Sequence, residues 1–271
     1  MKGSATARIA LFAMRRDRFI LPWWIAGGVL LYWSQAVSVE SIYPTQAEFD
    51  AAAETMANNP AFIAMAGPAR ALNTVGGQVT WQASAFGAVV AGLMSMVIVG
   101  RHTRAEEESG RDELVRAGAV GRLEPLVAVS LMVILANVVL GGLISASLIA
   151  YGLAVAGSVS LGLAAALAGL VFGAAALVAA QLSQATRTMY GLAGMVIAAS
   201  YVLRAVGDVG NPTLSWLSPI GWGRSRSLGS RSSGCFCLQR WSPSRVWPRS
   251  DTVTSADRRG KDGRSLGDVR L

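Results

Sequence analysis

Long uncharged apolar runs alternate with short polar segments along the chain. We predict membrane-spanning helices at about 19–37, 81–100, 125–148, 161–181 and 190–203. A helix needs about 20 apolar residues to cross the hydrocarbon core of a bilayer. The first four runs are close to that length, and the fifth is the shortest and weakest. The stretch 125–182 has no charge and is too long for one span, so we place a turn near Gly157 and Ser158. The pattern therefore predicts an all-α, polytopic transmembrane helix bundle.

Composition favours a membrane protein over a soluble one. The 271 residues are 52% hydrophobic and only 15% charged, whereas soluble domains are about a quarter charged. The buried core of a large soluble protein is the alternative, but five such runs exceed what one core holds. For the first run the alternative is a cleaved signal peptide. Its apolar part is long and no clear A-x-A site follows, so we predict an uncleaved span.

Basic residues set the predicted orientation. They gather before the first span and again between the second and third, whereas the loop 38–80 holds only Arg70. Because cytoplasmic loops are enriched in Lys and Arg, we predict a multi-pass cell-membrane protein with segment 1–18 and loop 101–124 in the cytoplasm and loop 38–80 outside. The net charge of +8 lies at the ends of apolar segments and in the tail, which does not favour nucleic-acid binding.

Local patterns predict further features. Segment 1–18 is predicted to form a basic amphipathic helix on the inner leaflet, with an unstructured flank as the alternative. Thr45 and Glu48 form a capping-box pattern that predicts a short external helix ending before Pro60. A GxxxG pattern at residues 169–173 predicts close approach of another helix. Four tryptophans lie near predicted span ends, as interfacial residues do: Trp23, Trp24, Trp81 and Trp216.

The sequence lacks the motifs of several function classes. It has neither a P-loop nor an HExxH pattern. Cys235 and Cys237 have no second pair for zinc, and the single histidine, His102, is predicted to be a solvated loop residue. The predicted spans contain no Asp, Glu or Lys, and Arg204 lies at or past the end of the fifth. Because ion-coupled carriers usually need buried ionisable groups, we predict a permease that is not itself an enzyme and needs an external motor.

The densest charged block is RHTRAEEESGRDELVRAGAVGR, residues 101–122. The acidic run 106–108 favours a helix N-terminus, whereas Arg116 and Arg122 favour a C-terminal end. A motor protein can attach to such a block, and a solvated loop helix is the alternative. Arg116 can pair with Asp112 or Glu113 on a helix.

This block resembles the cytoplasmic loop of ABC-2-type exporter permeases. The resemblance is strongest to the actinobacterial tetronasin or polyketide-antibiotic exporter family. Two other stretches support it, in the expected order: YPTQAEFDAAAETMANNPAFIAMAGPA in the predicted outer loop and LSWLSPIGWG after the fifth span. The resemblance covers about residues 1–223. Ala119 departs from the broader pattern, which often has proline there.

The resemblance implies a coupling helix that docks on a separate ATPase subunit. The positions that match the motif are Glu107, Gly110, Glu113, Leu114 and Arg122. It also implies export of hydrophobic antibiotics or drugs, with ATP and Mg bound by the partner and no cofactor in this chain. The expected partners are the ATPase, a second permease half or copy, membrane lipid and a hydrophobic small molecule, with no nucleic acid.

The segment 223–271 differs from the rest in composition. It holds both cysteines and 11 of the 24 Lys and Arg, and it is rich in Ser. Such a composition predicts disorder. Since the family would have a sixth span here, we expect this tail to be out-of-frame translation. The competing hypothesis from another class is a non-transporting membrane subunit or an inactive fragment of a disrupted permease gene.

Overall fold

The computed structural model describes residues 3–43, 45–68, 72, 74–108, 123–210 and 217–221. Its main helices are α1 (Gly3–Arg16), α2 (Ile20–Ile42), α3 (Gln46–Ala57), α4 (Pro60–Ala66), α5 (Val75–His102), α6 (Arg104–Glu108), α8 (Glu124–Tyr151), α9 (Val155–Leu182) and α10 (Thr186–Val209). Five are long and apolar enough to cross a membrane, namely α2, α5, α8, α9 and α10. The predicted all-α bundle with five spans is confirmed.

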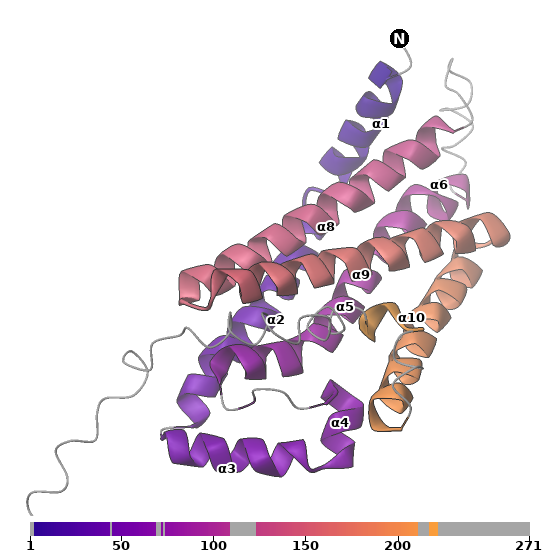
Figure 1. Ribbon diagram of the computed structural model, residues 1–271. Helices are drawn as coiled ribbons and strands as arrows, with labels where there is room; N and C mark the ends of the chain where they lie inside the picture. The colour runs from indigo at the N-terminus through magenta and orange to yellow at the C-terminus, as the bar shows by residue number, and fades with distance from the viewer. Residues whose placement is uncertain are drawn as a thin grey trace, which may run out of the picture.

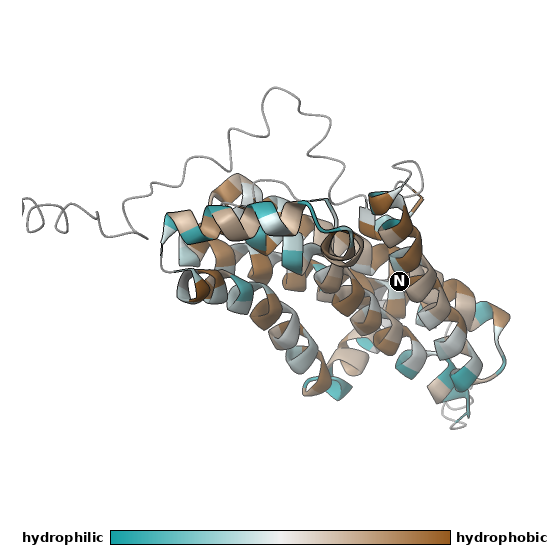
Figure 2. Cartoon of the chain, turned by 90° about the horizontal axis from the view of Figure 1, so that it is seen from below, coloured by the Kyte–Doolittle hydropathy of each residue, from teal (hydrophilic) through white to brown (hydrophobic). Residues whose placement is uncertain are grey.

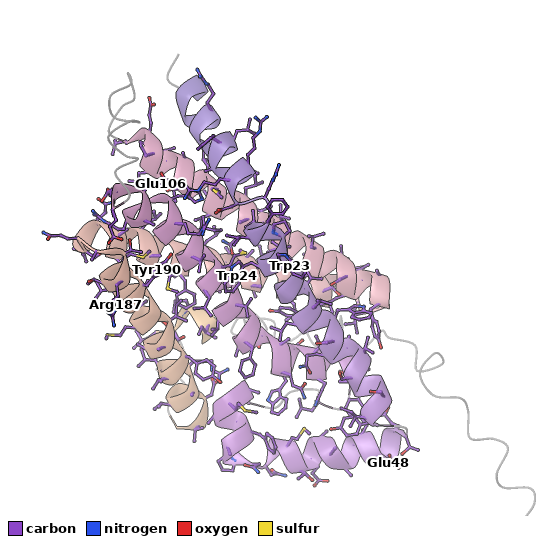
Figure 3. All side chains as sticks on the ribbon, turned by 180° about the vertical axis from the view of Figure 1, so that it is seen from behind. Trp23, Trp24, Glu48, Glu106, Arg187 and Tyr190 are labelled. Carbon is purple, nitrogen blue, oxygen red and sulfur yellow. The ribbon has the colours of Figure 1, made fainter. Side chains whose placement is uncertain are left out.

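The five long helices pack side by side, and the shorter helices lie at the two ends of the bundle (Figure 1). α9 lies between α8 and α5, while α2 contacts α5 and α8, and α10 contacts α9 and α5. We call α3 and α4, residues 46–66, the cap. Glu48 in the cap and Glu106 in α6 lie at opposite ends of the molecule (Figure 3). These ends are called the cap end and the α6 end below.

The interior of the bundle consists largely of small residues. Hydrophobic residues run along the long helices, on their outward faces as well as inside (Figure 2). Large apolar side chains such as Val138 and Leu143 of α8 are exposed, whereas Ala83, Ala91 and Ala180 are fully or almost fully buried. Small residues at helix interfaces let backbones approach closely, which stabilises helix packing in a membrane where lipid tails are as apolar as leucine.

The turn between α8 and α9 lies at residues 152–154, not near Gly157 and Ser158 as predicted. Gly152 adopts a left-handed conformation with φ of 106°. The amide of Gly152 donates to the Ile149 carbonyl and the next amide to the Leu148 carbonyl, the hydrogen bonds of a Schellman motif. Gly157 and Ser158 remain helical inside α9.

Two helix starts in the cap follow local capping chemistry. The Thr45 hydroxyl accepts a hydrogen bond from the Glu48 amide at 3.3 Å, so the predicted N-cap of α3 is confirmed. α3 ends at Ala57, before Pro60 as predicted. A second helix that we did not predict begins at Pro60, where the Asn59 side chain caps the Ala61 amide at 2.9 Å.

The predicted close approach at residues 169–173 is confirmed. A Cβ atom placed on Gly173 would lie 2.7 Å from Val133 Cγ1, and one on Gly169 would overlap the Asn137 side-chain oxygen. The Asn137 amide nitrogen donates to the Ser95 hydroxyl at 2.8 Å. The two glycines therefore let α9 approach α8 closely, beside a hydrogen bond that joins α8 to α5.

Residues 3–16 form a helix, so the unstructured alternative for them is wrong, while their position on a membrane leaflet stays a prediction.

Trp23 is exposed near the start of α2, as an interfacial residue requires. α5 begins at Val75, earlier than predicted, so Trp81 lies within the helix rather than at its start. Its side chain is buried. Its indole donates to the Gly67 carbonyl at 2.6 Å, so the interfacial prediction was wrong for Trp81. Trp216 lies outside the described residues.

Candidate functional site

The charged block begins with a sharp break in the helix. α5 ends at His102 and α6 begins at Arg104, with Thr103 in a non-helical conformation between them. The Thr103 carbonyl accepts hydrogen bonds from the Glu106 and Glu107 amides at 3.1 and 3.2 Å.

A buried carboxylate holds the end of α5. Asp17, between α1 and α2, is 2% exposed. Its Oδ1 accepts hydrogen bonds from Arg101 Nε and Nη2 at 3.2 and 3.0 Å, and its Oδ2 lies 2.8 Å from His102 Nε2. A buried charge is stable only when it is paired and hydrogen-bonded. These contacts tie the α1–α2 joint to α5.

The same network extends into α6. His102 Nδ1 lies 3.4 Å from Glu106 Oε1, and Glu106 Oε1 accepts a hydrogen bond from Arg16 Nη1 at 2.6 Å. We call Arg16, Asp17, Arg101, His102 and Glu106 the junction cluster. The prediction that His102 is a solvated loop residue is wrong, since its imidazole is buried between two carboxylates.

α6 is also anchored on its other side. Arg104 Nε donates to the Ala180 carbonyl of α9 at 2.6 Å. The Glu108 carboxylate accepts a hydrogen bond from the amide of Thr186, the first residue of α10, at 2.7 Å. Amides at a helix start have no partner within the helix, and a carboxylate there is favourable. Charged side chains of α6 therefore reach three other parts of the bundle: the α1–α2 joint, α9 and α10.

Of the predicted coupling residues, Glu107 lies in α6. Its carboxylate is partly exposed and pairs with Arg104, next to Glu106 of the junction cluster in sequence. The other predicted residues lie outside the described residues, and their roles stay predictions: Gly110, Glu113, Leu114, Arg116 and Arg122. The sequence reasoning missed Asp17, although it is the only acidic residue in the basic segment 1–18.

A second buried polar cluster lies at the cap end. Arg204 of α10 is 1% exposed. Its Nη2 donates to the carbonyls of Ala64 and Met65 in α4 at 2.7 and 2.8 Å. Its Nε lies 3.6 Å from a carboxylate oxygen of Asp208, one turn further along α10.

This cluster corrects a prediction about the fifth span. α10 runs from Thr186 to Val209 and is longer than the predicted range 190–203. Arg204 and Asp208 consequently lie inside the helix rather than past its end. The premise that the spans lack buried ionisable groups fails for α10, although the partners of Arg204 are the cap carbonyls and a residue of its own helix.

Both clusters are networks of ion pairs and hydrogen bonds. Over the described ranges, no group of three or more His, Cys, Asp and Glu is placed to hold a metal ion. The junction cluster joins parts of the chain that are far apart in sequence, Asp17 and His102 being separated by 85 positions. It therefore connects α6 and the end of α5 to the α1–α2 joint.

Comparison with known proteins shows that the chain is similar in sequence to a transporter. No family model matches it. It is 40% identical over 212 residues, 77% of its length, to the multidrug efflux system permease protein Rv1217c of Mycobacterium tuberculosis. The chain spans 38% of the length of that relative. With its five candidate spans, this chain is a multi-pass helical membrane protein homologous to part of a multidrug efflux permease.

Proposed function

We propose that this chain is a membrane-spanning permease subunit of an ATP-driven exporter of hydrophobic antibiotics or drugs. The name of its relative, the five apolar helices and the resemblance to ABC-2-type permeases of the tetronasin exporter family support this function. ATP and Mg belong to a separate ATPase subunit. The cap lies outside the cell, and the N-terminus and α6 lie in the cytoplasm, in accord with the distribution of Lys and Arg.

The anchoring of α6 is the observation that carries the proposal. α6 leads directly into residues 109–122, where the resemblance puts most of the contact with the ATPase. A displacement of that segment reaches α5 through the chain itself. It reaches the α1–α2 joint through Glu106 and His102, and it reaches α9 and α10 through Arg104 and Glu108. One docking event would thus act on most of the bundle.

A charge reversal tests the docking segment. In the assembled exporter, Glu113→Arg is expected to lower drug-stimulated ATP hydrolysis more than tenfold. The proposed docking puts Glu113 in a charge pair with the ATPase. Losing one partner of a buried interfacial pair costs about 2 to 5 kcal/mol, and an arginine in its place would also repel the positive group that Glu113 is proposed to bind. Glu54→Arg is the matched control, since it makes the same substitution on the exposed face of α3 at the other end.

Membrane insertion should be the same for both variants. If the Glu113→Arg protein keeps normal partner binding and normal hydrolysis, the coupling role of this residue is wrong. If the unmodified chain is stable in the membrane and binds no ATPase, the competing hypothesis of a non-transporting subunit or inactive fragment is supported instead.

The proposed topology predicts a labelling pattern in intact cells. On a background in which Cys235 and Cys237 are replaced by serine, Thr55→Cys should react with a membrane-impermeant maleimide and Ser109→Cys should not. Thr55 lies on the exposed side of α3. Ser109 follows α6 directly. Labelling at position 109 with protection at position 55 would reverse the orientation.

A further inference from the structure

Side chains of two membrane helices hold the cap by its last carbonyl groups. The final carbonyls of a helix have no partner inside it. In α4 the carbonyls of Ala64 and Met65 accept hydrogen bonds from Arg204 of α10. The carbonyl of Gly67, which follows α4, accepts one from Trp81 of α5 at 2.6 Å. The cap is thereby attached to α5 and α10 through its backbone.

The Arg204 guanidinium has donor groups that its bonds to the cap do not use. Its Nε and Nη1 are buried and make no hydrogen bond within the part of the chain that the structure describes. A carboxylate oxygen of Asp208 is 3.6 Å from Nε, beyond hydrogen-bonding distance but close enough for an ion pair. Because Asp208 lies on the same helix, this pairing remains available whether or not the cap is in place. A buried cation needs such compensation, and an ionisable residue in a membrane helix is a candidate functional group.

We propose that Arg204 forms a two-state latch between the cap and α10. In the latched state, which the structure shows, Nη2 binds the carbonyls of Ala64 and Met65. In the released state Arg204 gives up both carbonyls and closes the gap to Asp208, and α4 separates from α10. In the latched state the Tyr201 hydroxyl also donates to the Met65 carbonyl at 2.8 Å. This hydrogen bond is lost in the released state.

The latch connects to the other end of the bundle through the helices that carry it. α10 carries Arg204 near its end and Thr186 at its start, where Glu108 of α6 binds. α5 carries Trp81 near the cap and His102 in the junction cluster. A separation of α5 from α10 at the α6 end would pull on both attachments of the cap. This use in export rests on the proposed function, whereas the latch itself does not.

A buried reporter cysteine measures release of the cap in the purified full-length chain. Ala66, at the end of α4, is 1% exposed, so Ala66→Cys should react with a maleimide only when the cap separates. Cys235 and Cys237 are replaced by serine throughout. Arg204→Met should raise the reaction rate about tenfold or more, because it removes charge-assisted hydrogen bonds that exist only in the latched state. Asp208→Asn should lower the rate, because it removes the partner that stabilises released Arg204.

Matched variants separate the latch from general destabilisation. Arg187→Met makes the same substitution at an exposed position of α10 and should leave the rate unchanged. Tyr201→Phe removes one hydrogen bond to the cap without removing a charge, so it should give a smaller increase than Arg204→Met. A second reporter, Ala91→Cys, lies fully buried in the middle of α5 and should stay unreactive in every variant.

Three results would overturn the latch. If Ala66→Cys reacts equally slowly with and without Arg204, this residue does not hold the cap. If Arg204→Met and Asp208→Asn both raise the rate, Asp208 supports the latched state and there is no exchange. If Ala91→Cys also becomes reactive, Arg204 stabilises the whole bundle. None of these results depends on an ATPase, so a failure of the latch is distinguishable from a failure of the proposed function.

Discussion

The free energy of unfolding of an Asp17→Asn protein is expected to fall by about 3 kcal/mol, the order of magnitude for removing one partner of a buried ion pair. The substitution keeps the size of the side chain but removes its charge. Arg101 and the buried His102 would then face a neutral amide in place of a carboxylate. Unfolding of the purified chain in mixed detergent micelles, followed by circular dichroism, measures the change.

Asp50→Asn is the control for this prediction. Asp50 is exposed on α3 and accepts a hydrogen bond from Gln46, so the same substitution there should change stability by less than about 0.5 kcal/mol. The effects of Asp17→Asn and Arg101→Gln should be non-additive when combined, since the two residues are in direct contact. Equal stability of the Asp17→Asn and Asp50→Asn proteins would show that the junction cluster does not hold the bundle together.

Gly162→Ala is expected to destabilise the contact between α8 and α9 by about 3 kcal/mol, the upper part of the range for overpacking a close interface. A methyl group on Gly162 would overlap the Gly141 carbonyl oxygen and the Ser145 hydroxyl. In the reverse direction, a methyl group on Gly141 would lie 2.5 Å from the Gly162 carbonyl oxygen. Because the obstacle is backbone, no change of rotamer relieves it, and the helices must move apart.

The neighbouring Gly142 provides a matched control. A methyl group there would meet no atom within 4 Å, so Gly142→Ala should leave the packing intact. It should raise stability slightly, because alanine is more favourable than glycine in a helix by up to about 1 kcal/mol. The same micelle unfolding measurement serves both variants. If Gly162→Ala and Gly142→Ala behave alike, the backbone contact between α8 and α9 does not contribute to stability.

Residue reasoning located the candidate site only in part. The density of charge in residues 101–122 pointed to the region that holds Arg101, His102 and Glu106 of the junction cluster, and the break that separates α6 from α5 lies within it. The resemblance singled out Glu107, which lies at the edge of the junction cluster. It offered no reason to choose Asp17 or His102. A lone acidic residue in a basic segment and a lone histidine have no spacing relationship that would reveal their contact.

The sequence by itself determined the number and approximate position of the spans, because in a bilayer the length of an uncharged apolar run decides whether a helix can cross. It also determined the start of α3, since the Thr45 cap acts within four residues. Only the tertiary structure decided the partners of the buried charges. Asp17 meets His102 across 85 positions and Arg204 meets Ala64 across 140. The physical reason is that buried and lipid-facing sides of these helices are both apolar, so hydropathy does not show which neighbour each side meets.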